Sequence, residues 1–413
     1  MKAPAWENPL WQSLLPLGRD GETGGYRRYS FTAADSACRD WFVNSALQRN
    51  LRTESDRNGN LWAWWDAGRG AGGEAAGAIA VGSHLDSVPD GGAFDGPLGV
   101  VSAFLAVDLV RARGFEPVRP IAVAAFTEEE GARFGRACLG SRLSSGVIDA
   151  ASARGLTDAD GVTLAEAMTS AGLDPARIGP DPQSLAHIAA FVELHIEQGS
   201  ALGPLGAAIG IAESIWPHGR WRIDFEGRAD HAGTTRLADR RDPMLAFAAT
   251  VLGARQAAEA AGGLATMSKV VAVPGGTNGI NSAVRAWLDA RAPDDQALTR
   301  LTGQVMETAR AAGVTHRVTV SAERESLSPL VEFDVDLRDR LMTALARQGM
   351  AAPVLPTGAG HDAGVLAGVL PTAMLFVRNP SGISHSPAEY ATPEDCEAGV
   401  EALAFVLEEL AGR

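Results

Sequence analysis

The segment Gly82–Gly99, GSHLDSVPDGGAFDGPLG, follows an apolar run and contains one histidine and three aspartates. His84 and Asp86 are separated by one residue, so their side chains point to the same side of an extended chain. Metal-bound imidazoles usually donate their second N–H to a carboxylate, and Asp86 is placed to accept it. Asp95 lies across a glycine-rich loop and could reach the same ion. The segment therefore predicts a divalent metal site, although a polar loop position explains His84 alone and a helix N-cap explains Asp95 alone.

Four further clusters of polar residues follow apolar runs or lie in glycine-rich turns. They are TEEEG at 127–131, ELHIEQG at 193–199, TGAGHDAG at 357–364 and SGISHSPAE at 381–389. Three consecutive glutamates repel one another, so in a buried position they require a cation or raised pKa values. On the surface at the start of a helix, attraction to the helix dipole would be sufficient to explain them. In the second cluster His195 could ligate a metal, Glu197 could orient it, and Gln198 offers an amide to a substrate.

The histidines and carboxylates of these clusters exceed the needs of one zinc ion. His84, His195 and His385, together with Asp95 and a glutamate of the TEEEG run, suit a pair of ions that share a carboxylate. Paired ions generate hydroxide near neutral pH, and a spare glutamate can transfer its proton. This chemistry indicates hydrolysis of an amide-like bond, but spacing alone does not choose among the three glutamates.

The apolar segments around the clusters predict the elements that must position them. Runs at 78–81 and 121–126 predict buried strands, and the segment 97–114 between them begins with proline and ends with glycine, which is typical of a helix. Strand, helix and strand in this order predict a parallel α/β sheet, to which a later strand at 372–378 also belongs. Ligands of such sheets bind beyond the carboxyl ends of the strands, where the clusters fall.

A different pattern occupies the middle of the chain. From about residue 213 the order of predicted elements is strand, helix, strand, strand, helix, strand, which is typical of an α+β unit with an antiparallel sheet. We therefore expect an α/β metal-binding domain with a mixed, mainly parallel sheet, formed by 1–212 and 328–413. A smaller α+β domain, 213–327, interrupts it.

The composition excludes several classes of function. The 413 residues carry a formal net charge of −14, which repels nucleic acid and anionic membranes. Three widely spaced cysteines predict neither a disulfide framework nor a zinc finger, and they favour a reducing cytoplasm. The sequence predicts no signal peptide and no membrane span. We expect a cytoplasmic protein that acts on a small molecule.

Seven motifs together resemble one enzyme family. In chain order they are GSHLDSV, GGAFDGPLGV, FTEEEGARF, ELHIEQG, HAGTT, GAGHDAG and GISHSPAE. They resemble the dinuclear metal amidohydrolases that include N-carbamoyl-L-amino acid hydrolase, β-ureidopropionase and allantoate amidohydrolase, over nearly the whole chain. The resemblance implies a metal-binding α/β domain with an inserted lid through which a homodimer forms. It also implies two divalent ions per subunit, with Zn²⁺ expected first and Mn²⁺, Co²⁺ or Ni²⁺ as alternatives.

The resemblance also implies roles for particular residues of the larger domain. The implied metal ligands are Asp95 as the bridge, His84 and His195 at one ion, and Glu130 and His385 at the other. Glu129 is implied as the general base, and Asp86 lies behind the ligands. Related exopeptidases generally have a carboxylate where this chain has His195, so this histidine favours carbamoyl-type substrates over peptides.

In the lid, the resemblance implies that His231 stabilises the oxyanion and that Asn278 and Arg291 bind the amino-acid portion of the substrate. A guanidinium binds a carboxylate with two hydrogen bonds, although without the resemblance Arg291 reads as a surface charge at a strand end. Gln198 and His361 are further implied substrate contacts.

Three departures from the family pattern lie in the lid. Arg236 follows HAGTT where proline is usual, Asn281 stands where proline is common, and IWPHGRW at 215–221 replaces a short turn. Trp216 and His218 in that segment either line the pocket or pack at the domain hinge. These departures concern the substrate and not the metal ligands.

The function expected first is hydrolysis of an N-carbamoyl-L-amino acid to amino acid, ammonia and carbon dioxide. Allantoate or another ureido acid is the next candidate substrate, because the same residues would serve it. An N-acyl-amino-acid deacylase or dipeptidase comes third. A non-catalytic relative would have lost ligands or the base, and all of them are present in this sequence.

Overall fold

The computed structural model describes residues 6–66 and 77–412. The chain divides into two compact units, Met1–Glu213 with Glu332–Arg413 and Ser214–Val331. None of the helices in the described part of the chain combines the length and the apolar composition that a bilayer crossing needs.

The larger unit is built on one sheet with a parallel centre. Its strands are β1 (Arg52–Ser55), β2 (Leu61–Trp65), β3 (Ala78–His84), β4 (Ile121–Phe126), β5 (Ile188–Ile196), β6 (Ile209–Ile215), β13 (Val331–Glu332), β14 (Val354–Thr357) and β15 (Thr372–Val377). The strand order is β1-β2-β4-β3-β5-β15-β6-β13, and β14 pairs with β6. β3 runs parallel to β4 and β5, and β5 runs parallel to β15, whereas β2 and β6 add antiparallel margins. The expected mixed, mainly parallel sheet is confirmed.

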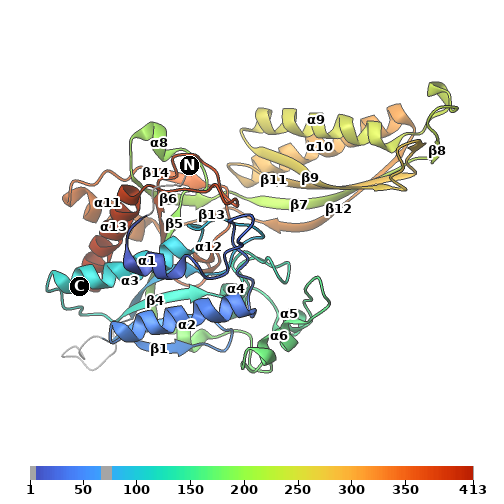
Figure 1. Ribbon diagram of the computed structural model, residues 1–413. Helices are drawn as coiled ribbons and strands as arrows, with labels where there is room; N and C mark the ends of the chain where they lie inside the picture. The colour runs from blue at the N-terminus through green and yellow to red at the C-terminus, as the bar shows by residue number, and fades with distance from the viewer. Residues whose placement is uncertain (1–5, 67–76, 413) are drawn as a thin grey trace. The chain divides into compact units, whose positions relative to one another are not determined.

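Helices cover this sheet, as Figure 1 shows. The helices of this unit are α1 (Pro9–Leu14), α2 (Ala33–Gln48), α3 (Pro97–Ala112), α4 (Leu139–Ser145), α5 (Ala150–Arg154), α6 (Leu164–Ser170), α7 (Pro182–Ala186), α8 (Leu202–Leu205), α11 (Val335–Arg347), α12 (Asp362–Leu366) and α13 (Pro393–Ala411), of which α5 and α6 pack in a separate small core. The core joins apolar side chains of α2, α3, α11 and α13 to the sheet, and α3 packs directly on α13. Strands β3, β4 and β15 are buried along their whole length, which explains their continuous apolar runs.

The smaller unit is an antiparallel sheet with two long helices. Its elements are β7 (His218–Glu226), β8 (Asp230–His231), a 3₁₀ turn (Leu237–Asp239), α9 (Pro243–Ala261), β9 (Leu264–Val273), β10 (Gly279–Ile280), β11 (Ala283–Arg291), α10 (Asp295–His316) and β12 (Thr319–Ser328). The sheet order is β12-β7-β11-β9, and β8 pairs with β10 beyond it. Alternate residues such as Ile223 and Phe225 are buried in a core shared with α9 and α10, so the other face of the sheet carries the polar residues.

One glycine lets the loop after β3 return to the sheet. Gly96 precedes α3 with φ +83°, and a Cβ atom there would overlap the imidazole ring of His84. Only glycine permits both this backbone conformation and this close approach. The loop therefore returns Asp95 to the end of β3.

Candidate metal centre

Two histidines lie side by side at the carboxyl edge of the sheet. His84 is the last residue of β3, and His195 is the last but one of β5. Because β3 and β5 are parallel neighbours, the two imidazoles meet, with ring centroids 5.8 Å apart. Both side chains are buried.

Asp95 joins these histidines to form a first group of potential ligands. Its Oδ1 atom lies 3.5 Å from Nε2 of His84 and 3.2 Å from Nε2 of His195. The three ligand atoms lie within 4.8 Å of one another. Asp95 does not cap α3, since Gly96 is the N-cap residue and no side chain caps that helix. The helix-cap interpretation of Asp95 is therefore wrong.

The other oxygen of Asp95 belongs to a second group. Nε2 of His385 lies 3.4 Å from Oδ2 of Asp95 and 3.6 Å from Oε2 of Glu130. The His385 side chain is 49% exposed, whereas Asp95 and Glu130 are nearly buried. The second group therefore opens to solvent, and the shared carboxylate connects it to the buried first group.

The hydrogen bonds of the buried histidines show which nitrogen faces Asp95 with a lone pair. Nδ1 of His84 lies 3.1 Å from the main-chain oxygen of Asp86, and Nδ1 of His195 lies 2.8 Å from that of Ile196. A carbonyl oxygen only accepts, so Nδ1 carries the proton in both rings. Nε2 of each ring and Oε1 of Glu130 are buried without a hydrogen-bond partner. Acceptor atoms that converge in this way fit a divalent cation.

The charges of the site favour a cation as well. Burial, followed by repulsion from Asp95, raises the pKa of Glu130 to about 7. A hydrogen bond to Asp95 raises the pKa of His385 to about 9 against the opposing effect of burial. Although burial alone would lower the pKa of His84, the charge of Glu129 and the nearby carboxylates of Asp86 and Asp95 outweigh it, so this pKa is raised. The site holds an excess of negative charge that metal ions would neutralise.

The structure separates the three glutamates of the TEEEG run. Oε2 of Glu129 lies 3.7 Å from Nε2 of His84, and burial raises the pKa of Glu129. Glu128 is turned away, because its Oε1 atom accepts hydrogen bonds from the main-chain N–H groups of Arg133 and Phe134. Glu130 belongs to the second ligand group, so Glu129 is the glutamate left beside the ligands without being one of them.

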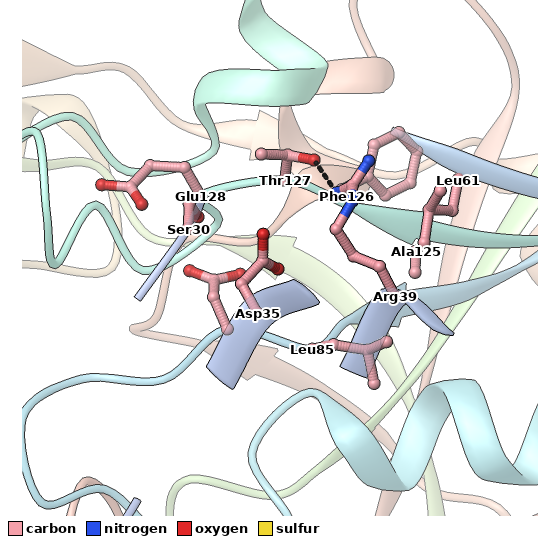
Figure 2. Close-up of a pocket in the computed structure, with 10 residues that line it drawn as sticks. Ser30, Asp35, Arg39, Leu61, Leu85, Ala125, Phe126, Thr127 and Glu128 are labelled. Atoms are coloured by element: carbon pink, nitrogen blue, oxygen red, sulfur yellow. Dashed lines mark hydrogen bonds between the residues drawn. The ribbon is translucent and has the colours of Figure 1, made fainter. Parts of the chain in front are cut away.

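Glu128 instead lines a small polar cavity (Figure 2). The cavity has a volume of about 10 Å³, and Asp35 and Arg39 of α2 also line it. This volume is at the lower limit for one water molecule. Residues 127–130 are not helical, so the interpretation of the run as a helix start is wrong.

Asp86 supports the site in a different way from the one expected. Its carboxylate lies 3.5 Å from Nδ1 of His84, but the Asp86 main-chain oxygen is closer and takes that hydrogen bond. The carboxylate accepts instead from the main-chain N–H groups of Glu129 and Glu130, both at 3.1 Å. Asp86 therefore fixes the turn that carries both glutamates.

Comparison with known proteins shows the family. Residues 80–409 match Peptidase family M20/M25/M40. The chain belongs to this family. The N-carbamoyl-L-amino acid amidohydrolase of Geobacillus stearothermophilus is 37% identical over 411 residues, which are 97% of this chain and 98% of that protein. The allantoate amidohydrolase of Escherichia coli strain K12 is 32% identical, over 96% of each chain.

Solved structures agree with this assignment. An amidase of the hydantoinase/carbamoylase family from Burkholderia multivorans is 30% identical with a TM-score of 0.86, over 98% of this chain and 97% of that one. A dinuclear metal-binding M20 peptidase from Bacillus subtilis, at 13% identity and a TM-score of 0.61, shares the fold. The protein is a hydrolase of carbon–nitrogen bonds other than peptide bonds, as the sequence predicts.

Two residues predicted to touch substrate lie beside the ligands of this M20 enzyme. Nε2 of Gln198 donates to Oδ2 of Asp95 at 2.9 Å and lies 3.2 Å from Nε2 of His385. His361 is buried with its ring 4.5 Å from that of His195, and its Nδ1 atom has no hydrogen-bond partner. Burial lowers the pKa of His361, so this ring stays neutral near pH 7.

The smaller unit brings His231 and Asn278 together. β8 pairs with β10 so that His231 faces Gly279, and the main-chain oxygen of Asn278 accepts a hydrogen bond from Ala232 at 3.0 Å. Nδ1 of His231 accepts hydrogen bonds from the main-chain N–H groups of Gly233 and Thr234 at 3.0 and 3.1 Å. Nε2 of this exposed ring therefore carries the proton and is a donor.

Arg291 is the last residue of β11, at the other end of the sheet. Its Nε atom lies 2.9 Å from Oδ1 of Asp289, and its Nη2 atom lies 3.4 Å from Oδ2. The register places His218 of β7 directly opposite Arg291. Asp289 therefore orients the guanidinium, and His218 is its cross-strand neighbour.

Sequence reasoning missed one supporting residue of the M20 site and misassigned another. Glu389, inside the GISHSPAE motif, accepts hydrogen bonds from the main-chain N–H groups of Phe94 and Asp95 at 3.1 and 2.9 Å. The signal available was a carboxylate close to His385. The suggestion that Glu197 orients His195 is wrong, because the Glu197 carboxylate accepts hydrogen bonds from the main chain at the start of α8.

Proposed function

We propose that the protein is a metal-dependent N-carbamoyl-L-amino acid amidohydrolase. Water would cleave the ureido group to give the amino acid, ammonia and carbon dioxide. The observation that carries the proposal is the pair of ligand groups that share Asp95, with Glu129 beside them and outside both. His195 supports carbamoyl substrates over peptides, because related exopeptidases generally have a carboxylate at this position.

Two divalent ions would be held by five side chains. The ligands would be His84, Asp95 and His195 for one ion, and Asp95, Glu130 and His385 for the other. Bound at these positions, the ions would lower the pKa of a water molecule and polarise the ureido carbonyl. We propose Zn²⁺ first, with Mn²⁺, Co²⁺ and Ni²⁺ compatible with the same imidazole and carboxylate donors.

Glu129 and His231 would manage the proton and the developing negative charge. The Glu129 carboxylate would take the proton of the attacking water and return it to the leaving nitrogen. Its raised pKa supports this role, because a weak acid holds a proton more readily than an ordinary carboxylate does. Nε2–H of His231 would donate to the oxyanion of the tetrahedral intermediate, which the hydrogen bonds at its Nδ1 support.

Arg291 would bind the substrate carboxylate, and Asn278 would contact the same amino-acid portion. The guanidinium is held by Asp289, so its orientation is fixed before substrate arrives. Gln198 and His361 would complete the contacts from the larger unit.

His218, the cross-strand neighbour of Arg291, favours a second candidate substrate. This candidate is a ureido acid that carries an additional hydrogen-bond donor. Nδ1 of His218 lies 3.2 Å from the main-chain oxygen of Trp216 and must therefore be the protonated nitrogen. Burial lowers the pKa of His218, which keeps the ring neutral. Its Nε2 atom is then an acceptor beside Arg291, suited to a hydroxyl or N–H group near the substrate carboxylate. Allantoate and other ureido acids meet this requirement.

A second subunit is needed if His231 and Arg291 act on one substrate molecule. Arg291 lies opposite the first residue of β7, whereas β8 follows the last one. The first and last of the nine residues of β7 are about 26 Å apart at ~3.3 Å per residue, which is too far for a small ureido acid to touch both ends. We therefore propose a homodimer in which the smaller unit of one subunit completes the site of the other.

The test is ammonia release from metal-loaded protein, with a chelated control. The panel would contain N-carbamoyl-L-amino acids of several side chains, allantoate and N-acetyl-L-amino acids. Chelator-sensitive ammonia from a carbamoyl or ureido acid supports the proposal, and the preferred compound identifies the substrate. Release of amino acid from the acetyl compounds alone would replace the proposal with a deacylase.

A further inference from the structure

Cys138 contacts Glu129 at both its main chain and its side chain. The main-chain N–H of Cys138 donates to the main-chain oxygen of Glu129 at 2.6 Å, and the Cys138 thiol donates to Oε1 of Glu129 at 3.3 Å. The second distance is ordinary for a hydrogen bond from sulfur. Both residues are buried.

The two oxygens of the Glu129 carboxylate therefore have different surroundings. Oε1 faces the thiol, whereas Oε2 lies 3.7 Å from Nε2 of His84, on the side of the first ligand group. A carboxylate rotates about its terminal bond unless a partner holds it. In the described part of the chain, the thiol is the side-chain group that donates a hydrogen bond to this carboxylate, and it leaves Oε2 as the oxygen directed at the ligands.

The backbone at Cys138 adds a second, independent observation. This residue has φ +54° and ψ +38°, in the left-handed region that favours glycine. Strained positions of this kind cluster at functional sites. Glycine would fit this backbone with less strain, but it would supply no hydrogen-bond donor. What cysteine contributes at this position is therefore its thiol.

We infer that Cys138 is a positioning residue of the hydrolytic reaction, whose thiol holds Oε1 of Glu129 so that Oε2 exchanges the proton with the attacking water. The inference rests on the proposed function only in taking Glu129 as the base. It does not depend on which ureido, carbamoyl or acyl compound is the substrate.

The experiment compares the Cys138→Ala, Cys138→Ser and Cys138→Gly variants with the wild-type enzyme on its best substrate. Loss of one hydrogen bond to the base predicts a kcat about five- to tenfold lower in Cys138→Ala, with KM and bound metal unchanged. Cys138→Ser, which keeps a donor, is expected to lie between wild type and Cys138→Ala. Cys396→Ala is the matched control, because Cys396 is a free buried cysteine of α13.

Cys138→Gly separates positioning from a merely structural role. Relief of the left-handed backbone is expected to leave its Tm at or above that of Cys138→Ala, while its kcat falls as far. Activity that follows Tm or metal content across the three variants would overturn the inference, as would an unchanged kcat in Cys138→Ala.

Two further measurements keep this inference distinct from the proposed function. Infrared spectroscopy can follow the S–H stretching band of Cys138, which is identified by its loss in Cys138→Ser. This band is expected to move to higher frequency in Glu129→Ala, because the acceptor of the hydrogen bond is gone. An unmoved band would refute the hydrogen bond. Full turnover in Glu129→Gln would refute Glu129 as the base. Activity on acetyl compounds alone would refute the proposed substrate and leave Cys138 testable on that reaction.

Discussion

Oε2 of Glu389 accepts a hydrogen bond of 2.9 Å from the main-chain N–H of Asp95. The two residues are 294 positions apart in the chain, and the bond ties the main chain of Asp95 to the loop that carries His385. Partners of this kind orient metal ligands although they do not touch the ion.

The first prediction concerns this support. Glu389→Ala is expected to weaken metal binding 10- to 100-fold, the loss typical for such partners. Isothermal titration with Zn²⁺ would measure it, with Glu397→Ala, an exposed residue of α13, as the control. Equal affinities in the two variants would show that Asp95 is positioned without Glu389.

The second prediction distinguishes the three glutamates. Glu129→Gln is expected to lower kcat about 10³-fold and to retain both ions, because a general base is lost and no ligand is. Glu130→Gln is expected to lose one ion. Glu128→Gln, which changes a residue that faces the small cavity, is the control and should retain metal and most activity. Kinetics and metal analysis of the three proteins would show whether the roles of base and ligand belong to other glutamates of the run.

Removal of metal is expected to destabilise the larger unit. Without cations, Nε2 of His84 and of His195 have no hydrogen-bond partner beside Asp95. Ions present at 1,000 times their Kd would each stabilise the fold by about 4 kcal/mol. Chelation should therefore lower Tm by several degrees, and added Zn²⁺ should restore it. A Tm that is indifferent to chelation would contradict the proposed ligand groups.

The pH dependence of stability offers a test away from the metal site. Burial raises the pKa of Asp56 to about 6, from an ordinary value of 3.8. Between pH 4 and pH 6 the folded state keeps a proton that the unfolded chain has lost, so the free energy of unfolding falls as pH rises, by about 3 kcal/mol. Asp56→Asn should remove this slope. Urea titrations at several pH values would compare the two proteins, and parallel curves would refute the raised pKa.

Mixing two inactive variants tests the shared site. If His231 serves the partner subunit and Arg291 its own, a heterodimer of His231→Ala and Arg291→Ala chains contains one intact site. Random reassociation of equal amounts should restore about one quarter of wild-type activity, because half of the dimers are mixed and each has one working site. Dimers that stay inactive after mixing would show that each site takes both residues from the same subunit.

Much of the metal-binding unit follows from the sequence. Continuous apolar runs predict the buried strands β3 and β4, and parallel strands bring His84 and His195 to one edge because their carboxyl ends must meet there. The ordered motifs identified the family, and the comparisons confirm it.

The supports of these ligands could not be predicted in the same way. Glu389 and Cys138 act through single hydrogen bonds whose geometry depends on loop conformation, including a left-handed residue at Cys138. Neither spacing nor periodicity carries that information.

Asp95 belongs to both ligand groups, whereas each of the other four residues belongs to one group. Loss of Glu130 or His385 would leave a complete group of His84, Asp95 and His195, and therefore an enzyme that could hold one ion. Loss of Asp95 removes a ligand from both groups at once. Two ions bound at these positions would be coupled through one carboxylate, so a metal titration should deviate from two independent isotherms.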